Sequence, residues 1–95
     1  MGEIKHQHDE KKGAFVYEAD GQKLAEMVYT MAAPDKMIIE HTEVDESLKG
    51  QGIGKKLQSD LVDYVRANNI KVIPLCPFAK SEFEKNADYA DVLAD

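Results

Sequence analysis

The sequence predicts a mixed α/β fold of the α+β type, in which antiparallel N-terminal strands are followed by a parallel βαβ crossover. Three observations support this class: β-type runs joined by short turn signals before residue 45, a glycine-rich loop that opens an amphipathic helix, and an apolar β-type run directly after that helix. Strands joined through a helix lie parallel by a right-handed crossover, so the sheet must be mixed. A chain of 95 residues makes one small domain.

The N-terminal segment, residues 1–12, is polar and lacks hydrophobic periodicity. We therefore expect a partly flexible start, either frayed or an edge strand, with the single domain covering residues 13–95. His6 and His8 stand close to Asp9, which raises the question of a metal site. Histidines in a polar tail are usually solvated, so we expect no metal here.

Three antiparallel strands are expected in the N-terminal half. Residues 14–18 form the first, and the Asp-Gly pair at 20–21 is a strong hairpin turn signal. Residues 23–32 alternate apolar and polar side chains, as a partner strand does. The Pro-Asp pair at 34–35 turns the chain again, and residues 37–44 form the third strand.

The second half is expected to begin with a strongly amphipathic helix. Its apolar side chains recur every four residues and form one stripe, consisting of Ile53, Leu57, Leu61 and Val65. The Asn-Asn pair at 68–69 is a plausible stop, because asparagine tolerates the left-handed conformation at a helix end. Residues 71–76 are then expected to form a strand, and residues 81–95 to be helical or irregular.

The glycine-rich loop at residues 50–54 places bare backbone N–H groups at the start of this helix, where they can hold a phosphate. Glycine lets ligand oxygens approach the amides and permits a positive φ. The loop does not fit a Walker motif, because Lys49 stands at the position of its first glycine and Lys56 at the position of its serine or threonine. A dinucleotide fingerprint fails as well, since Lys55 or Leu57 stands at its third glycine. An ordinary strand-to-helix turn remains the alternative to a phosphate site.

The pattern that remains, Lys49-x-x-Gly52-x-Gly54, resembles the Arg/Gln-x-x-Gly-x-Gly/Ala pyrophosphate motif of the GNAT acyltransferase superfamily, with lysine in the first place. The segments 41–44 (His-Thr-Glu-Val) and 76–78 (Cys-Pro-Phe) are similar to those of a compact GNAT-like subfamily. The likeness covers nearly the whole chain after residue 12. It implies a minimal GNAT fold with a splayed cofactor cleft, and an acetyl-CoA-dependent N-acetyltransferase. The acyl donor would be a small molecule, and the amine acceptor, a small molecule or a protein, is not identified.

The resemblance also implies which residues bind acetyl-CoA. In the superfamily the loop amides hold the pyrophosphate, which here would be the amides from Gln51 to Lys55, and the lysines would add positive charge. The implied cofactor-binding residues are Val44, Lys49, Gly50, Gln51, Gly52, Ile53, Gly54, Lys55, Lys56, Cys76, Pro77 and Phe78.

Acyl transfer to an amine needs a neutral amine and a polarised thioester carbonyl. His41 is a candidate base, with Glu43 as a further one; by strand alternation both should share a face with Met37 and Ile39. A structural histidine is the alternative for His41. Cys76 should point into or beside the cleft, where it is either a nucleophile or a buried apolar side chain.

The chain also departs from larger GNAT enzymes. Between its first two strands it has only a tight turn where those enzymes carry helices, and their final strand pair has no counterpart here. The acceptor half of the site is therefore reduced. A CoA- or acyl-CoA-binding module or sensor with little turnover is the main alternative function, and a purely structural domain is the second.

Composition limits the partners. A formal net charge of −6 argues against nucleic acid, because binding to phosphate backbones relies on clusters of lysine and arginine. No apolar run approaches the roughly 18 residues of a membrane span, and no signal-peptide pattern is present. Cys76 is the single cysteine and cannot form an internal disulfide. We therefore expect a cytoplasmic protein without a membrane partner.

Overall fold

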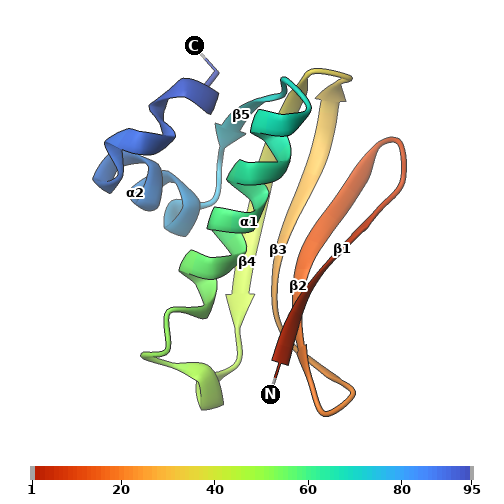
Figure 1. Ribbon diagram of the computed structural model, residues 1–95, viewed down its shortest axis with the longest axis vertical. Coiled ribbons are helices and arrows are strands. Elements are labelled where there is room, and N and C mark those ends of the chain that lie inside the picture. Colours follow the sequence, from red (N-terminus) through yellow and green to blue (C-terminus); the bar gives the residue numbers. More distant parts are fainter. Residues whose placement is uncertain (1, 95) are drawn as a thin grey trace.

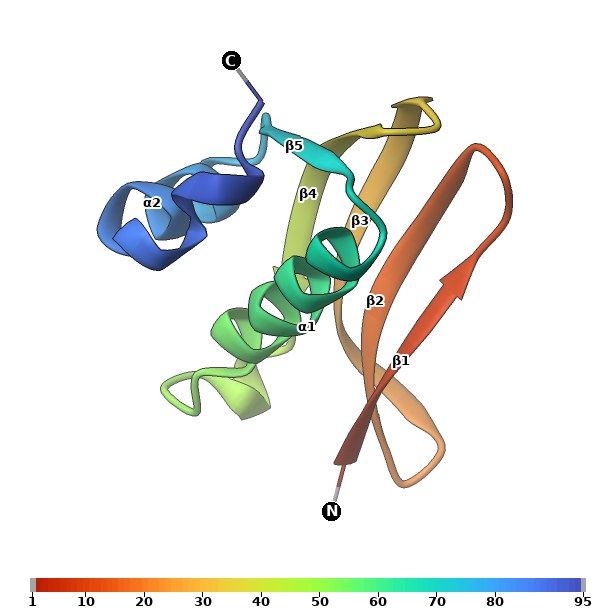
Figure 2. The same ribbon diagram turned by 45° about the horizontal axis from the view of Figure 1, so that its top comes forward.

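The computed structural model describes residues 2–94 and shows a five-stranded mixed sheet with its helices packed on one face (Figures 1 and 2). The elements in chain order are β1 (Gly2–His8), β2 (Lys12–Ala19), β3 (Gln22–Ala33), β4 (Lys36–Val44), η1 (Glu46–Leu48), α1 (Ile53–Ala67), β5 (Lys71–Pro74), α2 (Pro77–Lys85) and η2 (Ala87–Val92). The strands lie in the order β1-β2-β3-β4-β5. β1 to β4 are antiparallel and β5 pairs parallel with β4, so the predicted fold class is confirmed.

The N-terminal segment is an edge strand, the second of the two forms expected for it. β1 pairs with β2 over its whole length, from Gly2 opposite Ala19 to His8 opposite Gly13. His6 is partly buried on the helix-bearing face, where it stacks on other rings, so the expectation of a solvated side chain is wrong for His6. Pairing with β2 places the polar segment in the sheet, so that alternate side chains along β1 point to the core.

The core lies between the sheet and the helices. The predicted apolar stripe of α1 is buried: Leu57, Leu61 and Val65 are fully inaccessible to solvent. The helix α1 packs against β2, β3 and β4, and α2 lies beside α1 against β4 and β5 (Figure 2). Burying a side chain of this kind contributes about 1.5–3 kcal/mol relative to exposure. No helix of residues 2–94 is long and apolar enough to cross a membrane.

A β-bulge in β4 decides which side chains reach the core. Tyr29 of β3 pairs with Ile39, whereas the preceding residue, Val28, pairs with His41, so Glu40 is an extra residue on β4. One extra residue reverses the alternation of the strand. Thr42 and Val44, which pair with the core-facing Met27 and Ala25, lie on the helix-bearing face.

The bulge corrects one prediction. His41 and Glu43 do share a face, but it is the open face of the sheet, opposite to the buried Met37 and Ile39. Both side chains are exposed. Simple alternation along β4 therefore gave the wrong side for this pair, because it did not include the extra residue at Glu40.

Candidate functional site

The loop between β4 and α1 is folded by local hydrogen bonds. Asp45 follows β4 and caps the short helix η1: its carboxylate accepts from the Ser47 N–H at 3.0 Å and from the Ser47 hydroxyl at 2.6 Å. Gly50 and Gly52 then adopt positive φ values of 83° and 71°. Other residues rarely take this conformation, so the two glycines set the path of the loop.

The start of α1 presents free backbone donors. Gly52 is the N-cap and supplies no side-chain bond, and the first intrahelical bond runs from the Lys56 N–H to the Gly52 carbonyl at 3.1 Å. The amides of Ile53, Gly54 and Lys55 lie before that bond and have no partner within the helix. Gln51 differs, because its N–H donates to the Leu48 carbonyl at 3.1 Å and so is already engaged.

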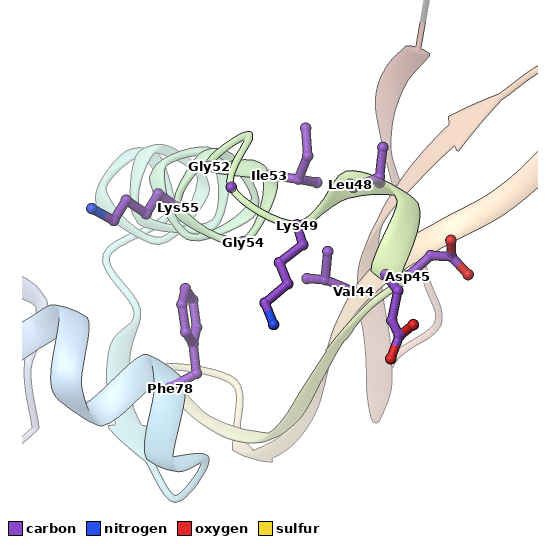
Figure 3. Close-up of a pocket in the computed structure, with 11 residues that line it drawn as sticks. Val44, Asp45, Leu48, Lys49, Gly52, Ile53, Gly54, Lys55 and Phe78 are labelled. Atoms are coloured by element: carbon purple, nitrogen blue, oxygen red, sulfur yellow. The ribbon is translucent and has the colours of Figure 1, made fainter.

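A cavity of about 420 Å³ opens beside these amides (Figure 3). Its lining combines the loop with the end of β4 and the start of α2, and consists of Val44, Asp45, Glu46, Leu48, Lys49, Gly50, Gly52, Ile53, Gly54, Lys55 and Phe78. The Lys49 side chain extends into the space between the loop and Phe78. Four predicted cofactor residues do not line the cavity: Gln51, Lys56, Cys76 and Pro77.

Phe78 forms one wall of the cavity and packs directly on the helix start. A Cβ atom at Gly54 would lie 2.8 Å from Cζ of Phe78, which is too close for two carbon atoms. Gly54 therefore lets α2 approach α1, whereas Gly50 and Gly52 serve the backbone conformation. Val44, one of the few exposed large apolar residues among residues 2–94, adds apolar surface at the same place.

β4 and β5 separate next to this cavity. Their pairing ends at Ile39 opposite Pro74, and the Ile39 carbonyl accepts both the Leu75 and Cys76 amides, at 3.0 and 3.1 Å. Farther along β4 the Asp45 N–H donates to β3, at the Leu24 carbonyl. Because successive residues of a strand direct their N–H and C=O groups to opposite edges, those of Thr42 and Val44 point to the other edge, where β5 has ended.

The structure places the candidate catalytic residues on two sides of the sheet. Cys76 is buried at the start of α2, and its thiol donates to Oγ1 of Thr42 at 3.3 Å. His41 and Glu43 lie on the open face. The structure thus brings Cys76 together with Thr42, a residue that the sequence reasoning did not select, rather than with His41.

The sequence reasoning also missed Asp45, Glu46 and Leu48 in the cavity lining. The Asp-x-Ser pattern at 45–47 was the available signal, because aspartate and serine in this spacing are typical of a capped turn. No comparable signal marked Thr42, since only the bulge turns it toward Cys76.

Comparison with known proteins identifies the family of the chain. The family model of GCN5-related N-acetyltransferases matches residues 14–92. A GCN5-like protein of Staphylococcus aureus, solved by NMR, is 39% identical, with a TM-score of 0.73 over 97% of this chain and 87% of that one. Protein NATD1 of Xenopus tropicalis is 26% identical over 87% of this chain and 77% of its own length.

A more distant structure shows the same fold with a ligand. A GNAT family acetyltransferase from Elizabethkingia anophelis, solved with acetyl-CoA bound, is 17% identical, with a TM-score of 0.59 over 67% of this chain and 42% of that one. The family model covers most of the chain, and the S. aureus protein matches it almost end to end. The chain therefore belongs to the GCN5-related N-acetyltransferase family and is an acyltransferase.

Proposed function

We propose that the chain binds acetyl-CoA in the cavity at the start of α1 and transfers the acetyl group to an amine. The observation that carries this proposal is the first turn of α1, where the amides of Ile53, Gly54 and Lys55 lack helical partners. Such amides and the positive end of the helix dipole bind phosphate oxygens. Lys49 and Lys55 add positive charge at the same cavity, which suits a pyrophosphate.

The rest of the cavity suits the other parts of the cofactor. Val44 and Phe78 offer apolar surface to the carbon atoms of the pantetheine arm. The backbone groups of Thr42 and Val44 point to the edge of β4 that β5 leaves free, so they can pair with amides of that arm as an added strand would. Acetyl-CoA supplies an activated thioester, and a backbone N–H of β4 is suited to hold its carbonyl oxygen.

Transfer to an amine breaks the thioester C–S bond and forms a C–N bond. The amine loses one proton, and the departing thiolate takes one up. His41 and Glu43 face the open side of the sheet, so we assign that side to the incoming amine and His41 to its proton, with Glu43 as the second candidate. An exposed imidazole is suited to pass this proton on to water.

Cys76 defines the alternative route, in which the acetyl group passes first to its sulfur and then to the amine. That attack requires a thiolate. The Cys76 side chain is 3% exposed and its S–H is bonded to Thr42. Direct attack by the amine needs no such deprotonation. We therefore propose direct transfer, with the Cys76–Thr42 contact holding the start of α2 against β4.

A CoA-binding module with little turnover is the second candidate function. The observation that favours it is the open face, where the His41 side chain is exposed and no helix of residues 2–94 covers the sheet.

The first measurement is an NMR titration with acetyl-CoA. We expect the amides of Ile53, Gly54 and Lys55 to shift and the cofactor to stabilise the fold by about 2.7 kcal/mol at a hundred times its Kd. If neither occurs, the loop is only a structural turn.

The second measurement is mass spectrometry of an amine library incubated with the protein and acetyl-CoA. We expect an acetylated amine, a loss of about 10²-fold or more in kcat/KM for His41→Gln, and nearly unchanged activity for Cys76→Ala. Loss of transfer in Cys76→Ala, together with an acetyl group on Cys76 of the parent protein, would establish the covalent route instead. Acetyl-CoA binding with no acetylated product would leave the sensor function.

A further inference from the structure

A second cavity, of about 510 Å³, lies at the opposite end of α1 from the glycine loop. Its lining residues come from the turn between β1 and β2, from β3 and the turn that follows it, and from the last turn of α1 and the residues just after it. Because α1 has 15 residues and rises 1.5 Å per residue, the two ends are about 20 Å apart. The cavity is therefore separate from the proposed acetyl-CoA site, and the inference drawn from it does not depend on acetyl transfer.

Three of the nine residues that line this cavity carry aromatic rings. His8, Tyr29 and Tyr64 line the cavity. Behind them His6 is stacked between His8 and Phe15, with ring centroids 4.2 and 4.1 Å apart. The ring of Tyr64 meets His6 edge-on at 4.4 Å. These contacts hold the rings from several directions, so the wall is preorganised.

Two members of the ring cluster, His6 and Tyr29, are uncharged near neutral pH. The hydroxyl of Tyr29 and Nε2 of His6 are 2.5 Å apart. Burial, with a smaller effect of His8, lowers the pKa of His6 to about 4. Burial, followed by the neighbouring Tyr64 and Asp9, raises the pKa of Tyr29 to about 12. His6 is therefore neutral and Tyr29 is a phenol, which donates its proton to the imidazole.

Two carboxylates contribute negative charge at this cavity. Asp9 and Glu10 line it, and none of its lining residues is a lysine or arginine. The Asp9 carboxylate is held in place by the N–H groups of Lys11 and Lys12, at 2.8 and 3.0 Å, and these bonds lower its pKa. The last turn of α1 adds the negative end of a helix dipole.

We propose that this cavity binds an organic ammonium ion. A cation is attracted to the faces of aromatic rings, and methylated ammonium groups are bound in this way by aromatic cages. The carboxylates and the end of α1 favour the same charge, while Met31, Pro34 and Ile70 provide apolar contacts for the carbon atoms of the ligand. Residues 2–94 contain no cluster of three or more acidic, histidine or cysteine ligands, which argues against a bare metal ion here.

The experiment compares two probes of equal shape and different charge. Choline and its neutral carbon analogue, 3,3-dimethylbutan-1-ol, are titrated separately into the protein labelled with 13C and 15N. We expect choline to cause saturable shifts at Asn68 and in the rings of His8 and Tyr64, and the neutral analogue to bind at least tenfold more weakly. Equal shifts from both probes, or a choline response that does not saturate, would overturn the proposal.

Two variants at one position separate ring chemistry from packing. Tyr64→Phe keeps the aromatic face and should bind choline within about twofold of the parent, whereas Tyr64→Leu should weaken binding at least fivefold. Should Tyr64→Leu fail to fold, Asp9→Asn is the second test, since an amide oxygen still accepts the turn N–H groups but carries no charge. If Asp9→Asn binds choline as tightly as the parent protein does, the proposed charge recognition is wrong.

The ammonium group can belong to a free small molecule or to a modified side chain, and two further arms distinguish these sources. One uses a peptide with a trimethyllysine, and the other the same peptide with leucine in its place. Binding of choline alone assigns a free ligand, and tighter binding of the trimethyllysine peptide assigns a side chain. In every arm the amides of Ile53 to Lys55 serve as the control, because they report the acetyl-CoA site and should not move.

Discussion

The two ends of α1 are built on different principles. Its N-terminal end uses backbone groups from one contiguous loop, with Gly50 and Gly52 fixing the conformation. Its C-terminal end uses side chains from three separate elements, β1, β3 and α1, which contribute His6, Tyr29 and Tyr64. The first end keeps unpaired amides available to a ligand, whereas at the second end packing and a hydrogen bond hold the rings in place beside the cavity. Backbone amides can be positioned by the local conformation of one loop, whereas side chains from distant segments are positioned only by the folded protein.

The largest difference between the two ends of α1 is expected when a glycine near each end is replaced by alanine. A Cβ at Gly13 would lie 2.5 Å from the Tyr29 hydroxyl and 2.6 Å from Cβ of His8, whereas one at Gly54 would meet only the Phe78 ring, at 2.8 Å. Tyr29 is buried and bonded to His6, so it cannot move aside easily. We expect Gly13→Ala to cost about 3 kcal/mol of unfolding free energy and Gly54→Ala about 1 kcal/mol, measured by urea denaturation.

The control for this prediction is relief of the contact. Phe78→Leu combined with Gly54→Ala should recover most of the loss at the loop end, because the ring is the only close neighbour there. Equal costs for the two alanine variants would show that the aromatic end is as adaptable as the loop, and the distinction between the two ends would be lost.

Strain in the glycine loop should affect ligand binding rather than folding alone. Gly52 has a φ of 71°, which a β-branched residue rarely adopts, so Gly52→Val should redirect the first amides of α1. We expect acetyl-CoA affinity, measured by calorimetry, to fall at least tenfold, or about 1.4 kcal/mol. Gly21→Val is the matched control, since Gly21 has a φ of 77° in the β2–β3 turn and is not part of the cavity. A similar loss of affinity in both variants would point to general destabilisation.

The same contrast explains what the sequence could predict. The fold class and the glycine loop depend on local patterns: the four-residue apolar period of α1 and the glycine spacing are visible in the chain itself. The aromatic cluster depends on pairing between distant segments. His6 stands in a polar stretch, and only its register opposite Phe15 turns it inward. Ile4, two residues earlier on the same strand face, is the main local hint of this orientation, and it does not set the register.

The candidate site was predictable to a similar degree. The amides at Ile53 to Lys55 follow from the loop pattern, but the engaged N–H of Gln51 depends on a tight turn with Leu48. The bulge at Glu40 has no signal of its own either. It arises where β3 and β4 are brought into register, and it moves His41 away from Cys76 to the open face. One extra residue in a strand is enough to move the side chains that follow it to the other face of the sheet.

The aromatic end should also make the fold sensitive to acid. The pKa of His6 is lowered to about 4, mainly by burial, from 6.5 in an unfolded chain. The unfolded state thus binds a proton more readily between these values, so the contribution to stability is complete above pH 6.5 and is lost as the pH falls toward 4. The effect should be smaller than that of Gly13→Ala, because His6 is only partly buried.

The measurement is the melting temperature between pH 4 and 7. His6→Phe should keep the ring stacking and flatten this part of the curve, while His8→Gln, at an exposed neighbour, should change it less. If His6→Phe shows the same acid-induced fall as the parent, the acid sensitivity comes from other groups. The glycine loop should contribute nothing to this pH dependence, because its donors are backbone amides, which do not titrate in this range.

The smallest effect is expected at the last turn of α1, where Arg66 makes an ion pair with Asp91 at 2.8 Å and thereby ties η2 to the helix. Both side chains are largely exposed, and exposed ion pairs contribute little to global stability because water and salt screen them. Arg66→Gln should therefore leave the melting temperature nearly unchanged. It should nevertheless speed hydrogen exchange at the Ala94 amide, which bonds the Val72 carbonyl at 2.8 Å, because the C-terminal segment would open more often. Unchanged exchange at Ala94 would show that packing of the segment, rather than the ion pair, holds it to α1.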